Sequence, residues 1–208
     1  MQNKKAKKRT PSHAKSGGAK KSFWAIAAVI AVIAVCFTSS HLMNKNNQEF
    51  LKTQYPIKYS EYVEEYCRKY NVSKALVYAV IRTESGFRED AGSSAGALGL
   101  MQIIPETFEW LQLMREAVGD YVTDDLYKPE INIDYGVYFL SYLLEKYESE
   151  ECAVAAYNAG FGAVDEWLGT PENSSDGIHL DYIPFDETRE YVKRVESAKE
   201  MYQQIYGF

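Results

Sequence analysis

The chain of 208 residues is long enough for one domain with short additional segments. Its charge is unevenly divided, because residues 1–48 carry nine Lys and Arg and no Asp or Glu, whereas residues 49–208 carry 14 against 29, a net charge of −15. The acidic part lacks the basic surface that neutralises phosphates, so we expect no nucleic-acid partner. Only three His are present and no cluster has metal-ligand spacing, which disfavours a zinc peptidase; we expect no metal and no other cofactor.

The N-terminal segment combines a basic tail with an apolar run. Residues 1–22 are rich in Lys, Ser and Gly and contain too few apolar residues to fold, which indicates a disordered tail. Residues 23–37 are all apolar, and uncharged residues extend the run to Met43, about the 20 residues that a spanning helix needs. The positive-inside rule then predicts a single-pass anchor over 23–43, with its basic tail in the cytoplasm and the rest of the chain outside.

A cleaved signal peptide is the alternative to this anchor, because the apolar core is short and a basic tail precedes it. No clear small-x-small cleavage site follows, although the small residues Thr38, Ser39 and Ser40 would permit a cut. A lipoprotein signal is disfavoured, since Val35 rather than a small residue precedes Cys36.

Residues 44–58 are predicted to form a linker, and residues 59–208 an all-α domain. Helices are expected over 60–70, 73–84, from Pro105 to about Val118, 131–147, 151–158 and 163–168, followed by a last helix with Tyr191, Val195, Ala198, Tyr202 and Ile205 along one stripe. Alternating strand patterns and repeats are absent from this part of the sequence. A domain of about 150 residues is large enough for its own core.

Two cysteines fall within the predicted domain. Cys67 and Cys152 both lie on apolar helical faces, so we expect buried free thiols. A disulfide between them is also possible outside the cell, and two cysteines alone do not decide between these states.

Glu84 is a carboxylate at an unusual position. Val77, Val80 and Ile81 precede it by seven, four and three residues, so helical spacing places Glu84 on the inward face. Burial penalises the charged form, so a group with an ordinary pKa of about 4.3 can stay protonated near neutral pH and donate a proton. An isolated Glu at a helix end is more often simply solvated. Gly86 then ends the helix and begins a glycine-rich loop.

The residues around this loop resemble a known family in three separate blocks. The blocks are Glu84-Ser85, Phe87, Ser93, Gly96-Ala97 and Gly99-Leu100-Met101-Gln102; then Ala156-Tyr157-Asn158-Ala159-Gly160; then Ile183-Pro184 with Glu187-Thr188-Arg189-Glu190-Tyr191-Val192. They are similar, in the same order, to the signatures of the soluble-lytic-transglycosylase-like (SLT) enzymes of glycoside hydrolase family 23, which share the goose-type lysozyme fold. Three blocks in this order between Glu84 and Val192 make a specific signal.

This resemblance implies a peptidoglycan lytic transglycosylase with a lysozyme-like helical domain. Glu84 would be the catalytic acid and later the base, and Glu187 a carboxylate near the cleft. The residues that the resemblance places along the sugar sites are Ser93, Met101, Gln102, Tyr157 and Asn158. From the residues alone, Tyr157 could equally be a core tyrosine, Asn158 a turn residue and Glu187 a first-turn acid favoured by the helix dipole.

The implied reaction cuts the β-1,4 bond between N-acetylmuramic acid and N-acetylglucosamine and leaves a 1,6-anhydro-muramyl end. The expected partners are glycan strands of the wall and, through residues 23–43, the cell membrane, with the domain facing the wall. Two alternatives stay open, a muramidase that uses water as acceptor and a non-catalytic wall-binding module. The chain departs from the family pattern at Arg88-Glu89, where many members have Asn-Pro, and at Phe139, where the family has a tyrosine.

Overall fold

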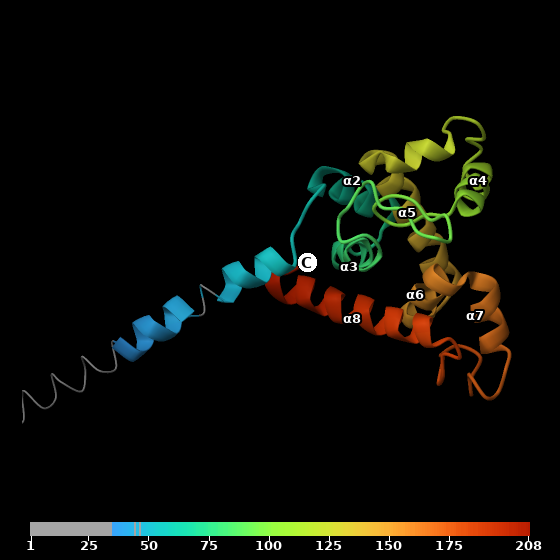
Figure 1. The fold of residues 1–208 in the computed structure, drawn as a ribbon. Helices are drawn as coiled ribbons and strands as arrows, with labels where there is room; N and C mark the ends of the chain where they lie inside the picture. The colour runs from blue at the N-terminus through green and yellow to red at the C-terminus, as the bar shows by residue number, and fades with distance from the viewer. Residues whose placement is uncertain (1–34, 44, 46) are drawn as a thin grey trace, which may run out of the picture. The chain divides into compact units, whose positions relative to one another are not determined.

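The structure, a computed structural model, describes residues 35–43, 45 and 47–208 (Figure 1). The predicted basic tail and most of the predicted membrane span lie outside these residues. The chain divides into two compact units at the boundary between Phe50 and Leu51. Each unit is described by itself.

The first unit is helical where it is described. Residues 35–43, 45 and 47–50 are helical, and residues 51–54 at the start of the second unit are helical too. Residues 47–54 of the predicted linker therefore have regular structure, because no Pro or Gly interrupts the chain before Pro56. Within the described ranges, no helix combines the length and the apolar character needed to cross a membrane, so the anchor over 23–43 stays a prediction.

The second unit is built from helices. They are α2 (Ser60–Tyr70), α3 (Lys74–Glu84), α4 (Pro105–Met114), the 3₁₀ helix η1 (Thr123–Tyr127), α5 (Pro129–Lys146), α6 (Glu150–Ala159), α7 (Phe161–Leu168) and α8 (Asp186–Tyr206). In the described residues, extended pairing is limited to two isolated bridges, Gly92 with Leu98 and Leu98 with Ile103. The predicted all-α domain is confirmed.

The third predicted helix is shorter than expected, and this prediction was wrong in detail. α4 ends at Met114 because Glu116 adopts a left-handed conformation (φ 54°) and the Ala117 N–H donates to the Gln112 carbonyl at 2.9 Å, which closes the helix end. Helical spacing over the predicted range would place Val118, and either Met114 or the adjacent Leu113, on the inward face. Leu113, Met114 and Val118 are instead exposed by 65%, 44% and 69%.

The core of the second unit surrounds α5, which contacts α2, α4, α6 and η1, while α3 packs against α8 (Figure 1). Ile133, Val137, Leu140 and Leu143 of α5 have no exposed surface. Gly136 leaves room for the Met101 side chain against α5, since a Cβ at position 136 would lie 2.3 Å from the Met101 Sδ. The absence of a side chain at Gly136 therefore lets the loop between α3 and α4 sit directly on the central helix.

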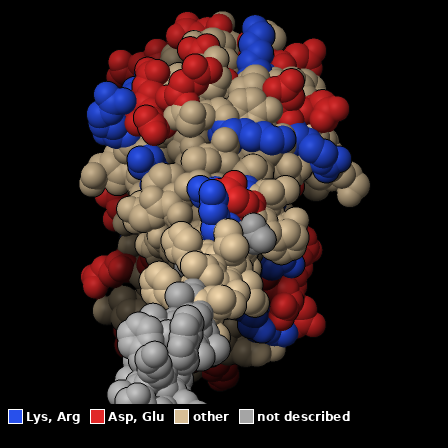
Figure 2. Space-filling model, turned by 90° about the vertical axis from the view of Figure 1, so that its left-hand side faces the viewer, with Lys and Arg blue, Asp and Glu red and all other residues tan. Residues whose placement is uncertain are grey.

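The state of the two cysteines and the charge of the surface agree with the sequence analysis. Cys67 and Cys152 are both buried and free, as expected. Figure 2 shows Asp and Glu side chains gathered on the upper part of the face in view, with fewer Lys and Arg among them. This agrees with the acidic composition of residues 49–208.

Candidate active site

Glu84 is the last residue of α3, and its neighbours hold it in place. The Ser85 hydroxyl donates to the Leu100 carbonyl at 2.7 Å, which ties the helix end to the glycine-rich loop. The chain then turns sharply, because Gly86 and Phe87 both have left-handed backbones (φ 61° and 65°). The Phe87 side chain is buried and its ring lies 6.3 Å from that of Tyr78, which secures the turn.

The environment of Glu84 changes its protonation. Burial raises its pKa from 4.5 to about 7, and the Tyr191 hydroxyl and the charge of Arg194 only partly oppose this. The desolvation expected from the apolar spacing before Glu84 is therefore present. Near neutral pH the group is divided between its acid and carboxylate forms, which suits a residue that gives up a proton and takes another back.

Two tyrosines lie beside Glu84, the partly buried Tyr157 and the buried Tyr191. Burial, together with the negative charge of Glu84, holds the pKa of both Tyr157 and Tyr191 well above the usual value, so both hydroxyls stay protonated. The Tyr157 hydroxyl donates to the Met101 carbonyl at 2.8 Å. The Tyr191 hydroxyl is buried beside Glu84, close enough to lower its pKa, without a hydrogen bond of regular geometry.

The glycine-rich loop is fixed by one buried amide on α5. Asn132 accepts from the Met101 N–H at 2.7 Å and donates to the carbonyls of Leu98 at 2.9 Å and Leu126 at 2.8 Å. Gly99 permits this approach, because a Cβ there would lie 2.4 Å from the Asn132 Nδ2. Asn132 therefore sets the distance between the loop and the core.

The loop residues assigned by the resemblance brace the loop in this structure. The Ser93 Oγ accepts from the Ala97 N–H at 3.0 Å, and the Gln102 Nε2 donates to the carbonyls of Ala91 at 3.1 Å and Gly99 at 2.9 Å. Gln102 itself has a left-handed backbone (φ 49°).

Met101 differs from the other assigned residues because its side chain has no exposed surface and lies against Gly136. Any contact from Met101 to a sugar would therefore come from its backbone. Contacts of this residue, and of Ser93 and Gln102, with a sugar stay predictions.

Asn158 and Glu187 meet at a pocket of about 590 Å³ between the end of α6 and the start of α8. The Asn158 Oδ1 accepts from the Thr188 hydroxyl at 2.8 Å, while Glu187 is exposed. The same two helices carry the tyrosines beside Glu84, since Asn158 follows Tyr157 in α6 and Thr188 lies one turn before Tyr191 in α8. Asn158 is therefore more than a turn residue, because its side chain connects two helices at the pocket.

Sequence reasoning missed three residues that build this site. Tyr191 was assigned only to the packing stripe of the last helix, and Ser85 and Asn132 received no role. Tyr191 and Ser85 lie inside the recognised blocks, which was the available signal. In the part of the chain that the structure describes, no group of three His, Cys, Asp or Glu is placed to hold a metal ion.

Comparisons with known proteins agree with this geometry. Residues 61–179 match the model of the Transglycosylase SLT domain. The chain belongs to this family. The soluble lytic murein transglycosylase of Salmonella typhimurium is 35% identical over 162 residues, which cover 76% of this chain and 25% of that protein. The membrane-bound lytic murein transglycosylase C of Pectobacterium atrosepticum is 30% identical over 167 residues, which cover 70% of this chain and 47% of that protein.

The solved structures of the SLT family confirm the fold. The 70 kDa soluble lytic transglycosylase of Escherichia coli aligns with a TM-score of 0.66 and 31% identity over 76% of this chain and 26% of that one. The SLT-type, lysozyme-like domain predicted from the sequence is therefore present. The chain spans about a quarter of the length of the soluble relatives it matches.

Proposed function

We propose that this chain is a peptidoglycan lytic transglycosylase that cleaves the β-1,4 bond between N-acetylmuramic acid and N-acetylglucosamine. The observation that carries the proposal is Glu84, a desolvated carboxylate with a pKa of about 7 at the end of α3. Membership of the SLT family and the names of the relatives support the same reaction class.

The first step is proton donation from Glu84 to the glycosidic oxygen. The bond to the anomeric carbon of the muramyl residue breaks, and the leaving sugar departs as a free alcohol. The 2-acetamido oxygen of the muramyl residue can stabilise the positive charge that develops at the anomeric carbon. Glu84 is left as a carboxylate, and the nearby Arg194 charge and Tyr191 hydroxyl favour this charged form.

In the second step the Glu84 carboxylate takes the proton of the 6-hydroxyl of the same muramyl residue. The freed oxygen attacks the anomeric carbon and closes a 1,6-anhydro ring, so no water is consumed and Glu84 regains its proton. A mechanism with one carboxylate fits the site, because among the described residues no other acid perturbs the pKa of Glu84. Two acids in close contact would shift one another's pKa.

The substrate contacts belong to the same proposal. Asn158 and Glu187 would line a sugar or peptide site in the pocket between α6 and α8, and Ser93 and Gln102 would present polar groups from the loop. The Gln102 amide oxygen makes no hydrogen bond with the described residues, so it is available to a hydroxyl of the substrate.

The proposal also places this domain on the outer face of the cell membrane, anchored through residues 23–43. The apolar run and the membrane-bound relatives support this location. Expression of the full chain followed by cell fractionation tests it. Recovery in the membrane fraction, lost when residues 23–37 are deleted, is expected, whereas recovery of the full chain in the soluble fraction would rule the anchor out.

Digestion of purified peptidoglycan by the full chain separates the three candidate functions. Fragments that end in anhydro-muramyl residues, lighter by one water than reducing ends, are expected. Reducing ends would instead identify a muramidase, and intact strands with retained binding a non-catalytic module. The Glu84→Gln variant should release no fragments while keeping its helical circular dichroism spectrum, since the amide cannot transfer the proton.

A further inference from the structure

A connected series of aromatic rings leads from the candidate active site to the surface. The Phe139 ring lies 5.2 Å from that of Tyr157, and the Trp110 ring lies 6.2 Å from that of Phe139. Trp110 is then 5.1 Å from Tyr142 and 5.7 Å from Phe161. We call Trp110 of α4, Tyr142 of α5 and Phe161 of α7 the aromatic platform.

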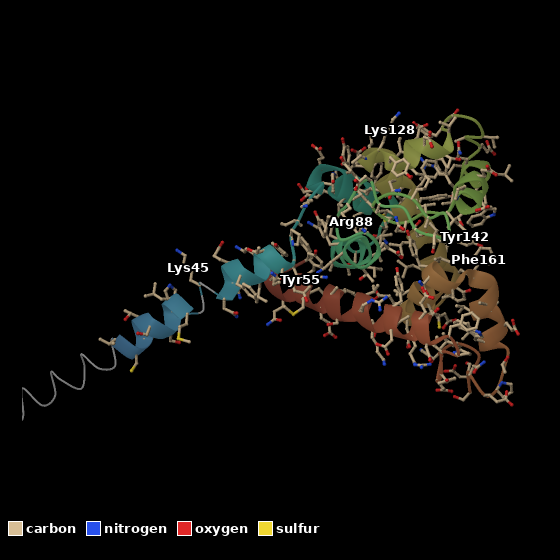
Figure 3. All side chains as sticks on the ribbon, viewed as in Figure 1. Lys45, Tyr55, Arg88, Lys128, Tyr142 and Phe161 are labelled. Atoms are coloured by element: carbon tan, nitrogen blue, oxygen red, sulfur yellow. The ribbon has the colours of Figure 1, made fainter. Side chains whose placement is uncertain are left out.

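The aromatic platform is accessible to a ligand. Phe161 is 36% exposed, and Trp110 and Tyr142 are half-buried. Tyr142 and Phe161 lie close together in Figure 3, with ring centroids 6.2 Å apart. The Tyr147 hydroxyl donates to the Phe161 carbonyl at 3.1 Å, which fixes the start of α7 beside α5. The three rings are therefore held at one place by three helices.

The polar side-chain atoms of the aromatic platform form no hydrogen bonds with the residues that the structure describes. Neither the Trp110 indole N–H nor the Tyr142 hydroxyl forms a hydrogen bond with any residue that the structure describes. Trp and Tyr combine a broad apolar face with a polar edge, and such a group binds best to a ligand that offers both C–H faces and hydroxyls. A pyranose ring has this character.

We propose that the aromatic platform is a distal sugar site that holds the same glycan strand on which Glu84 acts. The proposal rests on the proposed function. The occupant is a β-1,4-linked amino-sugar residue, stacked on the Trp110 ring and hydrogen-bonded by the indole N–H and the Tyr142 hydroxyl. Proximity favours this occupant, because the Phe139 ring contacts both Trp110 of the platform and Tyr157, and Tyr157 lies beside Glu84.

A distal site makes binding depend on the length of the glycan. A strand that reaches both Glu84 and the platform gains the stacking contact, whereas a shorter strand does not. The platform contains no Lys, Arg, Asp or Glu, so it binds the sugar through stacking and hydrogen bonds and its contribution is insensitive to salt.

Calorimetric titration of the full chain with peptide-free glycan strands tests the proposal, with Glu84→Gln in every sample to prevent cleavage. Addition of Trp110→Ala should raise the Kd for an octasaccharide about tenfold and the Kd for a disaccharide far less. Trp110→Phe should give an intermediate Kd, because it keeps a ring and removes the N–H. Tyr121→Ala is the matched control, since Tyr121 is 37% exposed and packs edge-to-face against Tyr135 outside the platform.

The outcomes separate this inference from the proposed function. An unchanged octasaccharide Kd in both Trp110→Ala and Phe161→Ala would overturn the platform, even if the wild-type chain releases anhydro fragments. The same holds if Trp110→Ala alters only the oligomeric state, which would make the platform a subunit contact. Conversely, a length-dependent loss of binding in a chain that cleaves nothing would support the platform and reject the enzyme.

Discussion

The Tyr191 hydroxyl of α8 is buried beside the Glu84 carboxyl group of α3 and lowers its pKa, although burial still raises that pKa to about 7. Tyr191 therefore acts as a positioning residue that favours the charged form of the catalytic acid. The close packing of α3 on α8 is what brings the two side chains together.

Replacement of Tyr191 by Phe should shift the pH dependence of cleavage. Glu84 must be protonated in the free enzyme, so kcat/KM falls as pH rises through its pKa of about 7. Without the hydroxyl the charged form loses a stabilising partner, so this midpoint should move to higher pH. Initial rates across a pH series measure this midpoint. A midpoint that is unchanged or lower in Tyr191→Phe would show that the hydroxyl does not act on Glu84.

Glu84 should reduce the stability of the fold as pH rises. Because the folded pKa of about 7 exceeds the ordinary value of 4.5, the folded state binds more protons between these values, and the free energy of unfolding decreases there as pH rises. The shift corresponds to roughly 3 kcal/mol, reached in full above pH 7. Urea unfolding at pH 4.5 and at pH 8 measures the free energy of unfolding of the wild-type chain and of the Glu84→Gln variant. The wild-type chain should lose stability relative to the variant at the higher pH; parallel behaviour would contradict the buried carboxyl group.

Gly136→Ala should displace the loop that carries Met101. An added Cβ would lie 2.3 Å from the Met101 Sδ, so the loop must move, although Ala alone would favour the helix by about 1 kcal/mol. Lower activity and a lower urea midpoint are expected. Combining Gly136→Ala with Met101→Ala removes the closest contact, with the Met101 Sδ, and leaves only the Met101 Cβ at 2.9 Å, so the double variant should be more stable than the sum of the single effects predicts. Strict additivity would exclude the proposed contact.

Asn132→Ala should also loosen the loop that carries Met101, because it removes the hydrogen bonds that hold this loop to α5. The substitution removes the three hydrogen bonds that the buried Asn132 side chain makes to Leu98, Met101 and Leu126, and should cost about 3 kcal/mol or more of unfolding free energy. Ser141→Ala is the control, because Ser141 only bonds the Tyr138 carbonyl of its own helix. Denaturation that places the two variants at similar midpoints would mean that Asn132 does not anchor the loop.

The sequence predicted the inward position of Glu84, but it did not predict the residues that surround Glu84, for a physical reason. Helical periodicity is local, so Val77, Val80 and Ile81 were enough to place Glu84 inward. The partner Tyr191 comes from a helix more than a hundred residues later, where the same periodicity describes packing alone.

Backbone partners were harder still to predict from the sequence. Asn132 binds the carbonyls of Leu98 and Leu126 and the N–H of Met101, which are backbone groups that do not depend on the side chain and leave no mark in the sequence. The end of α4 was misplaced for a similar reason, since the left-handed backbone that ends the helix is that of Glu116, a residue type that does not signal such a turn.

The most direct test of the central claim is cleavage of purified peptidoglycan in water labelled with heavy oxygen. If Glu84 alone closes the ring with the 6-hydroxyl, the muramyl ends released by the full chain will carry no label and will be anhydro ends. Muramyl ends that gain one labelled oxygen would contradict the account, because water would then be the acceptor.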